Sequence, residues 1–237
     1  MTLSMNNISV LLRSSLGRKL MMSLTGLFLI LFLVVHLAGN LQLLAGDGGE
    51  SFNRYSHFMS NSLLIQTISK LNFTFILLHV VYSIWLTRTN AAARPVGYAG
   101  KAEKAQSAWN SRNMGILGTL VLIFLIVHLK GFWYHLKFES PGLITLPLPG
   151  GGSETVADAY AVVRAAYSEA WYVAVYLLGL LAVGVHLHHG FRSAFQTLGL
   201  GHAGYSQVIR GVGAAFAWIV PALFALIPVM MYFEISF

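Results

Sequence analysis

The sequence predicts an all-α integral membrane protein with five transmembrane helices. Of its 237 residues, 56% are hydrophobic and only 10% are charged, and the mean hydropathy is +0.67. The apolar residues fall in five runs, each long enough to supply the ~20 residues that a helix needs to cross the hydrocarbon core. We expect helices at about 21–44, 62–87, 113–136, 171–195 and 208–233, and a long outer loop at about 137–170. The whole chain, 1–237, is expected to form a single membrane domain.

The five runs differ in how they begin and in what interrupts them. The first follows a segment of mixed polarity that ends at Lys19, and it is long enough to span, so we expect a helix rather than a cleavable signal peptide. A basic connection, Arg88–Arg112, separates the second run from the third. The fifth run contains Pro221 and Pro228, where we expect a kink whose freed carbonyl groups neighbouring helices can satisfy.

The outer loop between the third and fourth runs begins with turn-forming residues, namely Pro141, Pro147, Pro149 and Gly150–Gly152. Its second half, Thr155–Ala166, is expected to form a short surface helix. The chain shows no internal repeat of the kind that predicts a transporter built from duplicated halves.

Positive charge is divided unequally between the two sides of the membrane. Ten basic residues fall on the side of the N-terminus: Arg13, Arg18, Lys19, Arg88, Arg94, Lys101, Lys104, Arg112, Arg192 and Arg210. The opposite side carries most of the acidic residues and, among its connections, the basic residues Arg54, Lys137 and Arg164. Because cytoplasmic loops are enriched in Lys and Arg, we expect the N-terminus and the Arg88–Arg112 connection in the cytoplasm and the C-terminus outside. The net charge of +7 is explained in this way without a nucleic-acid partner. The expected location is a bacterial cytoplasmic (inner) membrane, which the family resemblance given below implies.

Four histidines lie inside four of the expected helices, one in each: His36, His79, His128 and His186. An ionisable side chain in the bilayer core is costly and marks a functional site by default. Four of them suggest a shared ligand, and haem iron, which imidazole binds axially, is the best candidate. The first four helices would then form the haem-binding bundle. The chain has no cysteine, which excludes thiolate-held iron–sulfur clusters in this chain and covalent attachment of haem.

Depth along the helices groups these histidines into two pairs. At 1.5 Å per residue, His36 and His128 each lie about 22 Å from the expected cytoplasmic end of their helix. His79 and His186 lie about 12–13 Å from that side. Each pair can clamp one iron from opposite sides, which predicts two bis-histidine sites stacked across the membrane.

A small residue follows each of the four histidines by one helical turn: Gly39, Ser83, Gly131 and Gly190. These residues share a helix face with the histidine, where a porphyrin needs room. Gly and Ser are also common where transmembrane helices pack closely, so each instance alone has a simple packing explanation.

Other interpretations of the histidines stay open. A single transmembrane histidine is often an interhelical hydrogen-bonding partner, and the set could form a proton relay in a haem-free transporter. Zinc or copper is a weaker candidate, because such sites gather three or four ligands at one depth. On the fourth helix, His189 is a rival to His186 as ligand, or a contact for a haem propionate, whereas His188 points elsewhere. The remaining histidines lie in or near loops: His57, His135 and His202.

Several stretches carry a resemblance to a known family: Gly17–Lys19, Thr25–Gly26, His36–Asn40, Phe52–Phe58 and His186–Gln196. From about Ser15 to Tyr232 the chain resembles the cytochrome b membrane anchor of succinate:quinone oxidoreductases (succinate dehydrogenases) and fumarate reductases, in the single-subunit, five-helix, two-haem form. The resemblance implies two haem b groups. It makes His79 and His186 the iron ligands of a proximal haem near the cytoplasm, and His36 and His128 those of a distal haem.

The same resemblance implies the partners and the reaction. A flavoprotein subunit with FAD and an iron–sulfur subunit would dock on the cytoplasmic face, as in respiratory complex II of the tricarboxylic acid cycle. Electrons would pass from succinate through these subunits and the haems to a quinone near the outer face, menaquinone being usual for two-haem anchors. The reverse flow would reduce fumarate. This chain would be the membrane subunit that does not bind the dicarboxylate. A dihaem anchor of another dehydrogenase remains the alternative, and a higher oligomer stays open.

One departure from the family concerns proton transfer. Some dihaem fumarate reductases have a buried glutamate two residues before the fourth-helix ligand, but here that position is Gly184. We therefore expect no proton route of that kind through this chain.

Polar residues at the two membrane edges are candidates for contacts with the cofactor and the quinone. Candidate propionate contacts are Arg18, Lys19 and Arg192, which topogenic charge or lipid contact explains equally well. Candidate quinone contacts are Asn40, Asn53, Tyr55 and His57, which ordinary loop structure also explains.

Overall fold

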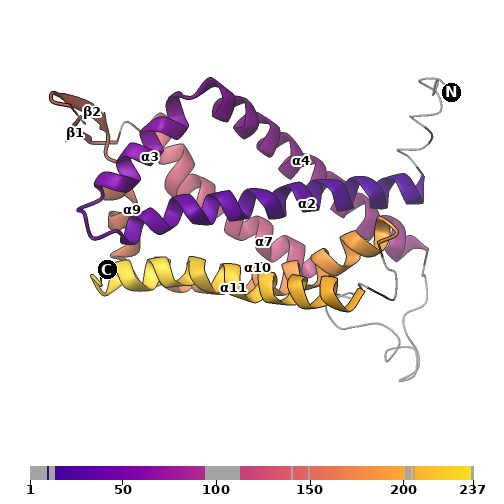
Figure 1. The fold of residues 1–237 in the computed structure, drawn as a ribbon. Helices are drawn as coiled ribbons and strands as arrows, with labels where there is room; N and C mark the ends of the chain where they lie inside the picture. Colours follow the sequence, from indigo (N-terminus) through magenta and orange to yellow (C-terminus); the bar gives the residue numbers. More distant parts are fainter. Residues whose placement is uncertain are drawn as a thin grey trace. The chain divides into compact units, whose positions relative to one another are not determined.

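Five long helices make up most of the structure. The computed structural model describes residues 14–93, 113–139, 141–148, 150–200 and 206–235, together with Val10 and Gly204. These residues are mostly helical, and five helices are long and apolar enough to cross a membrane (Figure 1). They cover Ser15–Leu44, Leu63–Ala92, Met114–Phe138, Ala170–Thr197 and Ser206–Tyr232. The five predicted spans are therefore confirmed, although the first begins earlier than expected and the second ends later.

The spans are built from the elements α2 (Ser15–Asn40), η1 (Leu41–Leu44), α4 (Leu63–Ala92), α7 (Met114–His128), η2 (Leu129–Tyr134), α8 (His135–Phe138), α10 (Ala170–Thr197) and α11 (Ser206–Tyr232). The segment η2 is a π-helical turn that directly follows His128. Helix α11 continues through both Pro221 and Pro228. Five of the basic residues used to predict the cytoplasmic side lie outside the described residues: Arg13, Arg94, Lys101, Lys104 and Arg112. Pro149 and His202, in two of the connections, also lie outside them.

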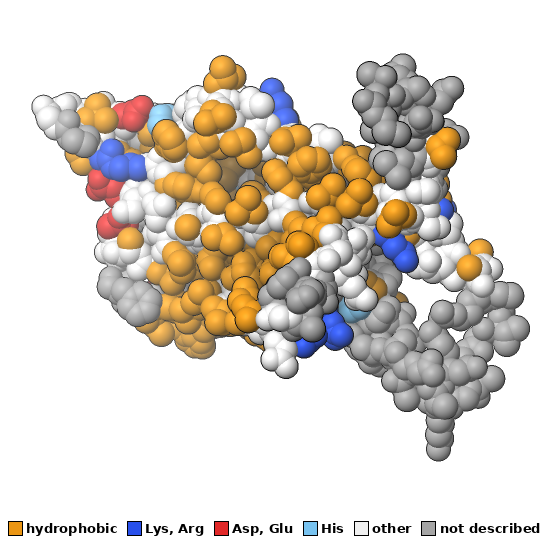
Figure 2. All heavy atoms as spheres, turned by 45° about the vertical axis from the view of Figure 1, so that its right-hand side comes forward, with side chains coloured by type: hydrophobic (Ala, Val, Ile, Leu, Met, Phe, Trp, Pro, Cys, Tyr) orange, Lys and Arg blue, Asp and Glu red, His pale blue; other side chains and the backbone are white. Residues whose placement is uncertain are grey.

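The outward surface of the helices is apolar. Figure 2 shows hydrophobic side chains over much of the visible face. Leu31, Leu77 and Leu178 are each at least 65% exposed, although they lie in the middle of long helices. Leaving such area in water costs about 25 cal/mol per Å², whereas hydrocarbon tails are as apolar as leucine, so this surface suits lipid.

The chain divides into two compact units, and every spanning helix contributes a segment to both. Unit 1 consists of Met1–Phe32, Leu71–Thr119 and Val183–Trp218. Unit 2 consists of Leu33–Lys70, Leu120–Ala182 and Ile219–Phe237. The largest buried cluster belongs to unit 2 and contains Leu43, Leu44, Phe52, Ala159, Val163, Tyr167, Tyr172, Val173, Tyr176, Ile227 and Met230.

The connection between the third and fourth spans differs from its prediction. Strands β1 (Leu143–Pro147) and β2 (Ser153–Ala157) pair in an antiparallel hairpin, with Thr145 opposite Thr155. All three residues of Gly150–Gly152 have positive φ, which only glycine adopts without strain, so they form the turn. The expected helix at Thr155–Ala166 is therefore wrong in its first four residues. Helix α9 (Ala159–Tyr167) begins only after Asp158, whose carboxylate accepts a hydrogen bond from the Ala161 N–H.

The connection between the first two spans contains a helix that sequence reasoning did not expect, α3 (Glu50–Asn61). The Asp47 carboxylate accepts hydrogen bonds from the N–H groups of Gly49 and Ser51, at 3.0 and 2.8 Å, and thereby starts this helix. Burial opposes ionisation of this carboxyl, but the hydrogen bonds from Ser51 and Gly49 outweigh it and lower the pKa of Asp47. Helix α3 contacts both β2 and α9 within unit 2.

Candidate functional site

In unit 1 the structure brings His79 of α4 next to His186 of α10. The centres of the two imidazole rings are 6.3 Å apart, and the ring planes are inclined by 66°. Both residues are partly buried. A pair of imidazoles from different helices at this spacing can bind one metal ion between them.

The two rings of this pair have different surroundings. His79 Nδ1 lies 3.1 Å from the hydroxyl oxygen of Thr25 on α2. His186 Nδ1 is buried and has no hydrogen-bond partner among the described residues. A buried polar atom without a partner costs about 1–3 kcal/mol, which is accounted for if the ring belongs to a site for a group outside the polypeptide.

In unit 2 the structure brings His36 of α2 next to His128 of α7. Their ring centres are 5.7 Å apart, and the planes are inclined by 82°. Phenylalanine rings surround the pair: Phe224 lies 5.6 Å from His36, and Phe132 lies 5.5 Å from His128, centre to centre. This apolar environment is suited to the flat, hydrophobic face of a porphyrin.

Polar contacts of the unit 2 pair come from Tyr176 and Asn40. The hydroxyl of Tyr176 on α10 lies 3.1 Å from His128 Nδ1. The Asn40 amide donates to the His36 carbonyl oxygen at 2.7 Å and lies 3.4 Å from His36 Nδ1. Asn40, predicted as a quinone contact, is therefore engaged with its own helix and with a candidate ligand.

The spacing of both pairs can be compared with that of two axial ligands on one iron. With a metal–nitrogen distance of about 2.0 Å, as in other imidazole complexes, and each nitrogen about 1.1 Å from its ring centre, the two centres lie about 6.2 Å apart. The unit 1 pair, at 6.3 Å, matches this value, and the unit 2 pair, at 5.7 Å, is half an ångström closer. The spacing of the ring centres in both pairs is therefore compatible with two imidazoles binding one metal ion.

The small residues predicted beside the histidines meet different surroundings. A Cβ added at Gly39 would overlap the ring of Tyr55, and one added at Gly131 would overlap the hydroxyl of Tyr172. Tyrosine side chains therefore pack directly against the backbone at these two glycines. Among the described residues, nothing lies within 4 Å of a Cβ added at Gly190, one turn from His186. The hydroxyl oxygen of Ser83 lies 3.9 Å from a Cβ added at Gly118.

The candidate propionate contacts all belong to unit 1. The Arg18 guanidinium stacks over the Trp85 ring at 4.7 Å, and its Nε donates to the Ser14 carbonyl oxygen. Lys19 and Arg192 are exposed at the start of α2 and near the end of α10. On α10, His189 is partly buried, and His188 is exposed with its ring 6.2 Å from that of Trp218.

Two of the candidate quinone contacts have structural roles in unit 2. Asn53 is fully buried; its amide donates to the Asp158 carboxylate at 2.9 Å, and its oxygen accepts from the Tyr160 N–H at 2.8 Å. It thereby ties α3 to the start of α9. Tyr55 packs on Gly39, and burial raises the pKa of its hydroxyl.

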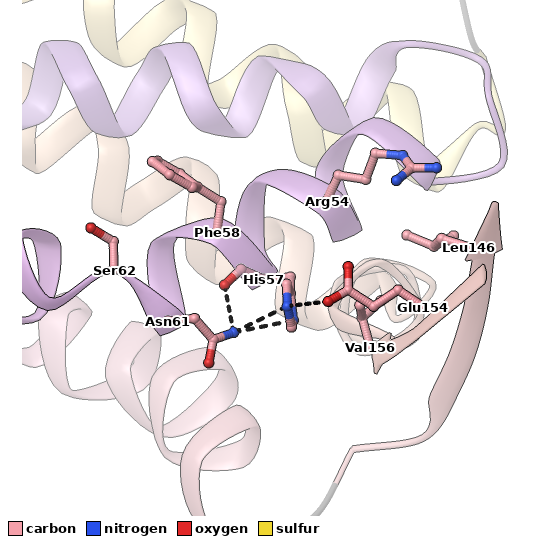
Figure 3. Close-up of a pocket in the computed structure, with 8 residues that line it drawn as sticks. All are labelled: Arg54, His57, Phe58, Asn61, Ser62, Leu146, Glu154 and Val156. Carbon is pink, nitrogen blue, oxygen red and sulfur yellow. Dashed lines mark hydrogen bonds and ion pairs between the residues drawn. The ribbon is translucent and has the colours of Figure 1, made fainter. Parts of the chain in front are cut away.

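His57 lies in a pocket of about 530 Å³ between α3 and the hairpin (Figure 3). Its Nε2 lies 3.0 Å from a Glu154 carboxylate oxygen, and the Asn61 amide approaches its ring from the other side. Arg54, on the same helix, binds Glu50 and the Pro147 carbonyl oxygen. The contacts of His57 with Glu154 and of Arg54 with the Pro147 carbonyl oxygen hold the hairpin against α3.

Sequence reasoning missed Tyr176, Glu154 and the role of Thr25 beside His79. Thr25 stood in one of the family-like stretches, but nothing in the sequence alone connects it with a histidine 54 positions later. Among the described residues, no three His, Cys, Asp or Glu side chains gather as a zinc or copper site requires. Comparisons with protein-family models, curated proteins and solved structures found no match to this chain.

Proposed function

We propose that this chain is a dihaem cytochrome b, the membrane anchor of a succinate:quinone oxidoreductase or fumarate reductase. The observation that carries the proposal is the approach of His79 to His186 and of His36 to His128, at spacings that suit two axial imidazoles. The family-like stretches His36–Asn40 and His186–Gln196, which contain two of these histidines, support the enzyme class.

Haem bound between two imidazoles supplies one-electron transfer at its iron. The chain's own contribution is to hold the imidazoles in facing pairs, to surround them with apolar side chains and to span the bilayer. Partner subunits that carry FAD and iron–sulfur clusters would dock on the cytoplasmic face, where the basic N-terminal segment is expected. A membrane quinone would exchange electrons near the opposite face.

The test is to purify the chain with its partners and to measure haem by the pyridine haemochrome assay. We expect two haem b per chain, together with flavin, iron–sulfur clusters and succinate dehydrogenase activity. His186→Ala should remove one haem, and His128→Ala should remove the other. A colourless protein would contradict the proposal and favour a proton relay. Two haems with partners of another dehydrogenase would contradict the enzyme class alone.

A further inference from the structure

We propose that Thr25 is a positioning residue that fixes the tautomer and orientation of the His79 ring and thereby tunes one haem without affecting the other. The inference rests on the proposed function, because it assigns Thr25 a part in holding a haem ligand. It goes further by naming a residue that touches neither iron nor quinone.

The direction of the hydrogen bond between Thr25 and His79 follows from the other contacts of the hydroxyl. Thr25 is only 2% exposed, so water does not replace its protein partners. Its hydroxyl has one hydrogen, and the Met21 carbonyl oxygen lies 2.8 Å away, with that of Met22 at 3.1 Å. A carbonyl can only accept, so the hydroxyl hydrogen is used within α2. The hydroxyl oxygen then accepts at its 3.1 Å contact with His79, and Nδ1 donates; the Met22 backbone is a second hydrogen-bonding partner of the His79 ring.

This hydrogen bond determines which nitrogen of His79 is free to bind a metal. With its hydrogen on Nδ1, a neutral imidazole carries its lone pair on Nε2. Gly26 packs against the same ring, since a Cβ added there would lie only 3.3 Å from His79 Cε1. The partner ring, His186, has no hydrogen bond at Nδ1, so in the described part of unit 1 the hydrogen-bonded support of the pair falls on His79.

An acceptor on Nδ1–H also makes the ring a stronger donor to a metal. A stronger donor favours ferric over ferrous iron, so removing the acceptor should raise the reduction potential of the haem that His79 holds. The effect should be confined to that haem, because the Thr25 hydroxyl contacts the His79 ring, whereas the hydrogen-bonding neighbours identified for His36 and His128 are Asn40 and Tyr176.

The experiment is a redox titration of the purified complex, followed at the haem α band, for Thr25→Val and Thr25→Ser. Valine keeps the shape of threonine but cannot accept, whereas serine restores the hydroxyl. We expect Thr25→Val to move one haem about three- to tenfold toward the ferrous form, tenfold being about 59 mV for one electron. Thr25→Ser should titrate like the unaltered protein. Tyr176→Phe, at the His128 contact, should leave this haem unchanged and serves as the matched control.

The outcomes separate this inference from the proposed function. Loss of one haem in Thr25→Val, with both kept in Thr25→Ser, would support the assignment. Removing a residue that hydrogen-bonds to a metal ligand weakens metal affinity about 10–100-fold. Two haems with unchanged potentials in Thr25→Val would overturn it, as would equal shifts of both haems or the same shift in Thr25→Ser. A complex without haem in the unaltered protein would refute the proposed function itself.

Discussion

The buried amide of Asn53 allows a direct test of how the connections that contain α3 and α9 are held together. Asn53→Ala removes one hydrogen bond to the Asp158 carboxylate and one from the Tyr160 N–H. A hydrogen bond to a charged group contributes about 1.5–3 kcal/mol and a neutral one about 0.5–1.5 kcal/mol. The Asp158 carboxylate and the Tyr160 N–H each lose this partner where α3 meets α9, so we expect a destabilisation of about 2–4 kcal/mol.

The effect should appear as a fall in the thermal midpoint of the detergent-solubilised protein. For a chain of this length, 1 kcal/mol corresponds to about 2–4 °C, so Asn53→Ala should lower the midpoint by about 5–15 °C. Asn61→Ala is the matched control, because Asn61 lies on the same helix but is exposed, and its loss should change stability by less than about 0.5 kcal/mol. Equal effects of the two substitutions would refute the view that Asn53 fastens α3 to α9.

Two further predictions concern glycine faces and a helix start. Gly39→Ala should destabilise the protein, since the added Cβ overlaps the Tyr55 ring. Gly190→Ala should stabilise the haem-free protein by up to about 1 kcal/mol, because alanine favours the helix, and should still reduce the haem content. Thermal midpoints and haem assays of the two variants check these expectations. The pKa of Asp47 is lowered in the folded state, so its contribution to stability is present above the unfolded value of about 3.9 and is lost as pH falls through the folded one. The thermal midpoint of Asp47→Asn should therefore fall less on acidification than that of the unaltered protein.

The spanning helices could be predicted from the sequence because a bilayer imposes a minimum length on any apolar helix. No comparable constraint acts on the connections. Helix α3 follows Gly49, whose φ of 92° only glycine adopts easily, and its first turn is set by Asp47, which from the sequence alone reads as a loop residue. In the connection between the third and fourth spans, Thr155 and Val156 are compatible with helix or strand. Pairing with β1, which depends on residues earlier in the chain, decides for the strand.

The candidate site was predictable to the extent that it depends on position along a helix. Depth alone grouped His36 with His128 and His79 with His186, and the structure places the rings of each group 5.7 and 6.3 Å apart. Rotation of a helix about its axis does not follow from depth. For this reason the contacts of Thr25 and Tyr176 with the rings could only come from the structure.

The two histidine pairs, though alike in spacing, differ in chemical setting. In unit 2 the rings lie among phenylalanines, the phenol of Tyr176 contacts His128, and tyrosines fill the faces of Gly39 and Gly131. In unit 1 an aliphatic hydroxyl contacts one ring, and, within the part of the chain that the structure describes, the other ring has no hydrogen bond at Nδ1 and nothing lies close to the Gly190 face. A cofactor held by either pair is tuned by hydrogen bonds to its ligands and by the polarity around them. Under the proposed function, two sites with such different surroundings should have different reduction potentials, and this difference would give electrons a preferred order of transfer between them.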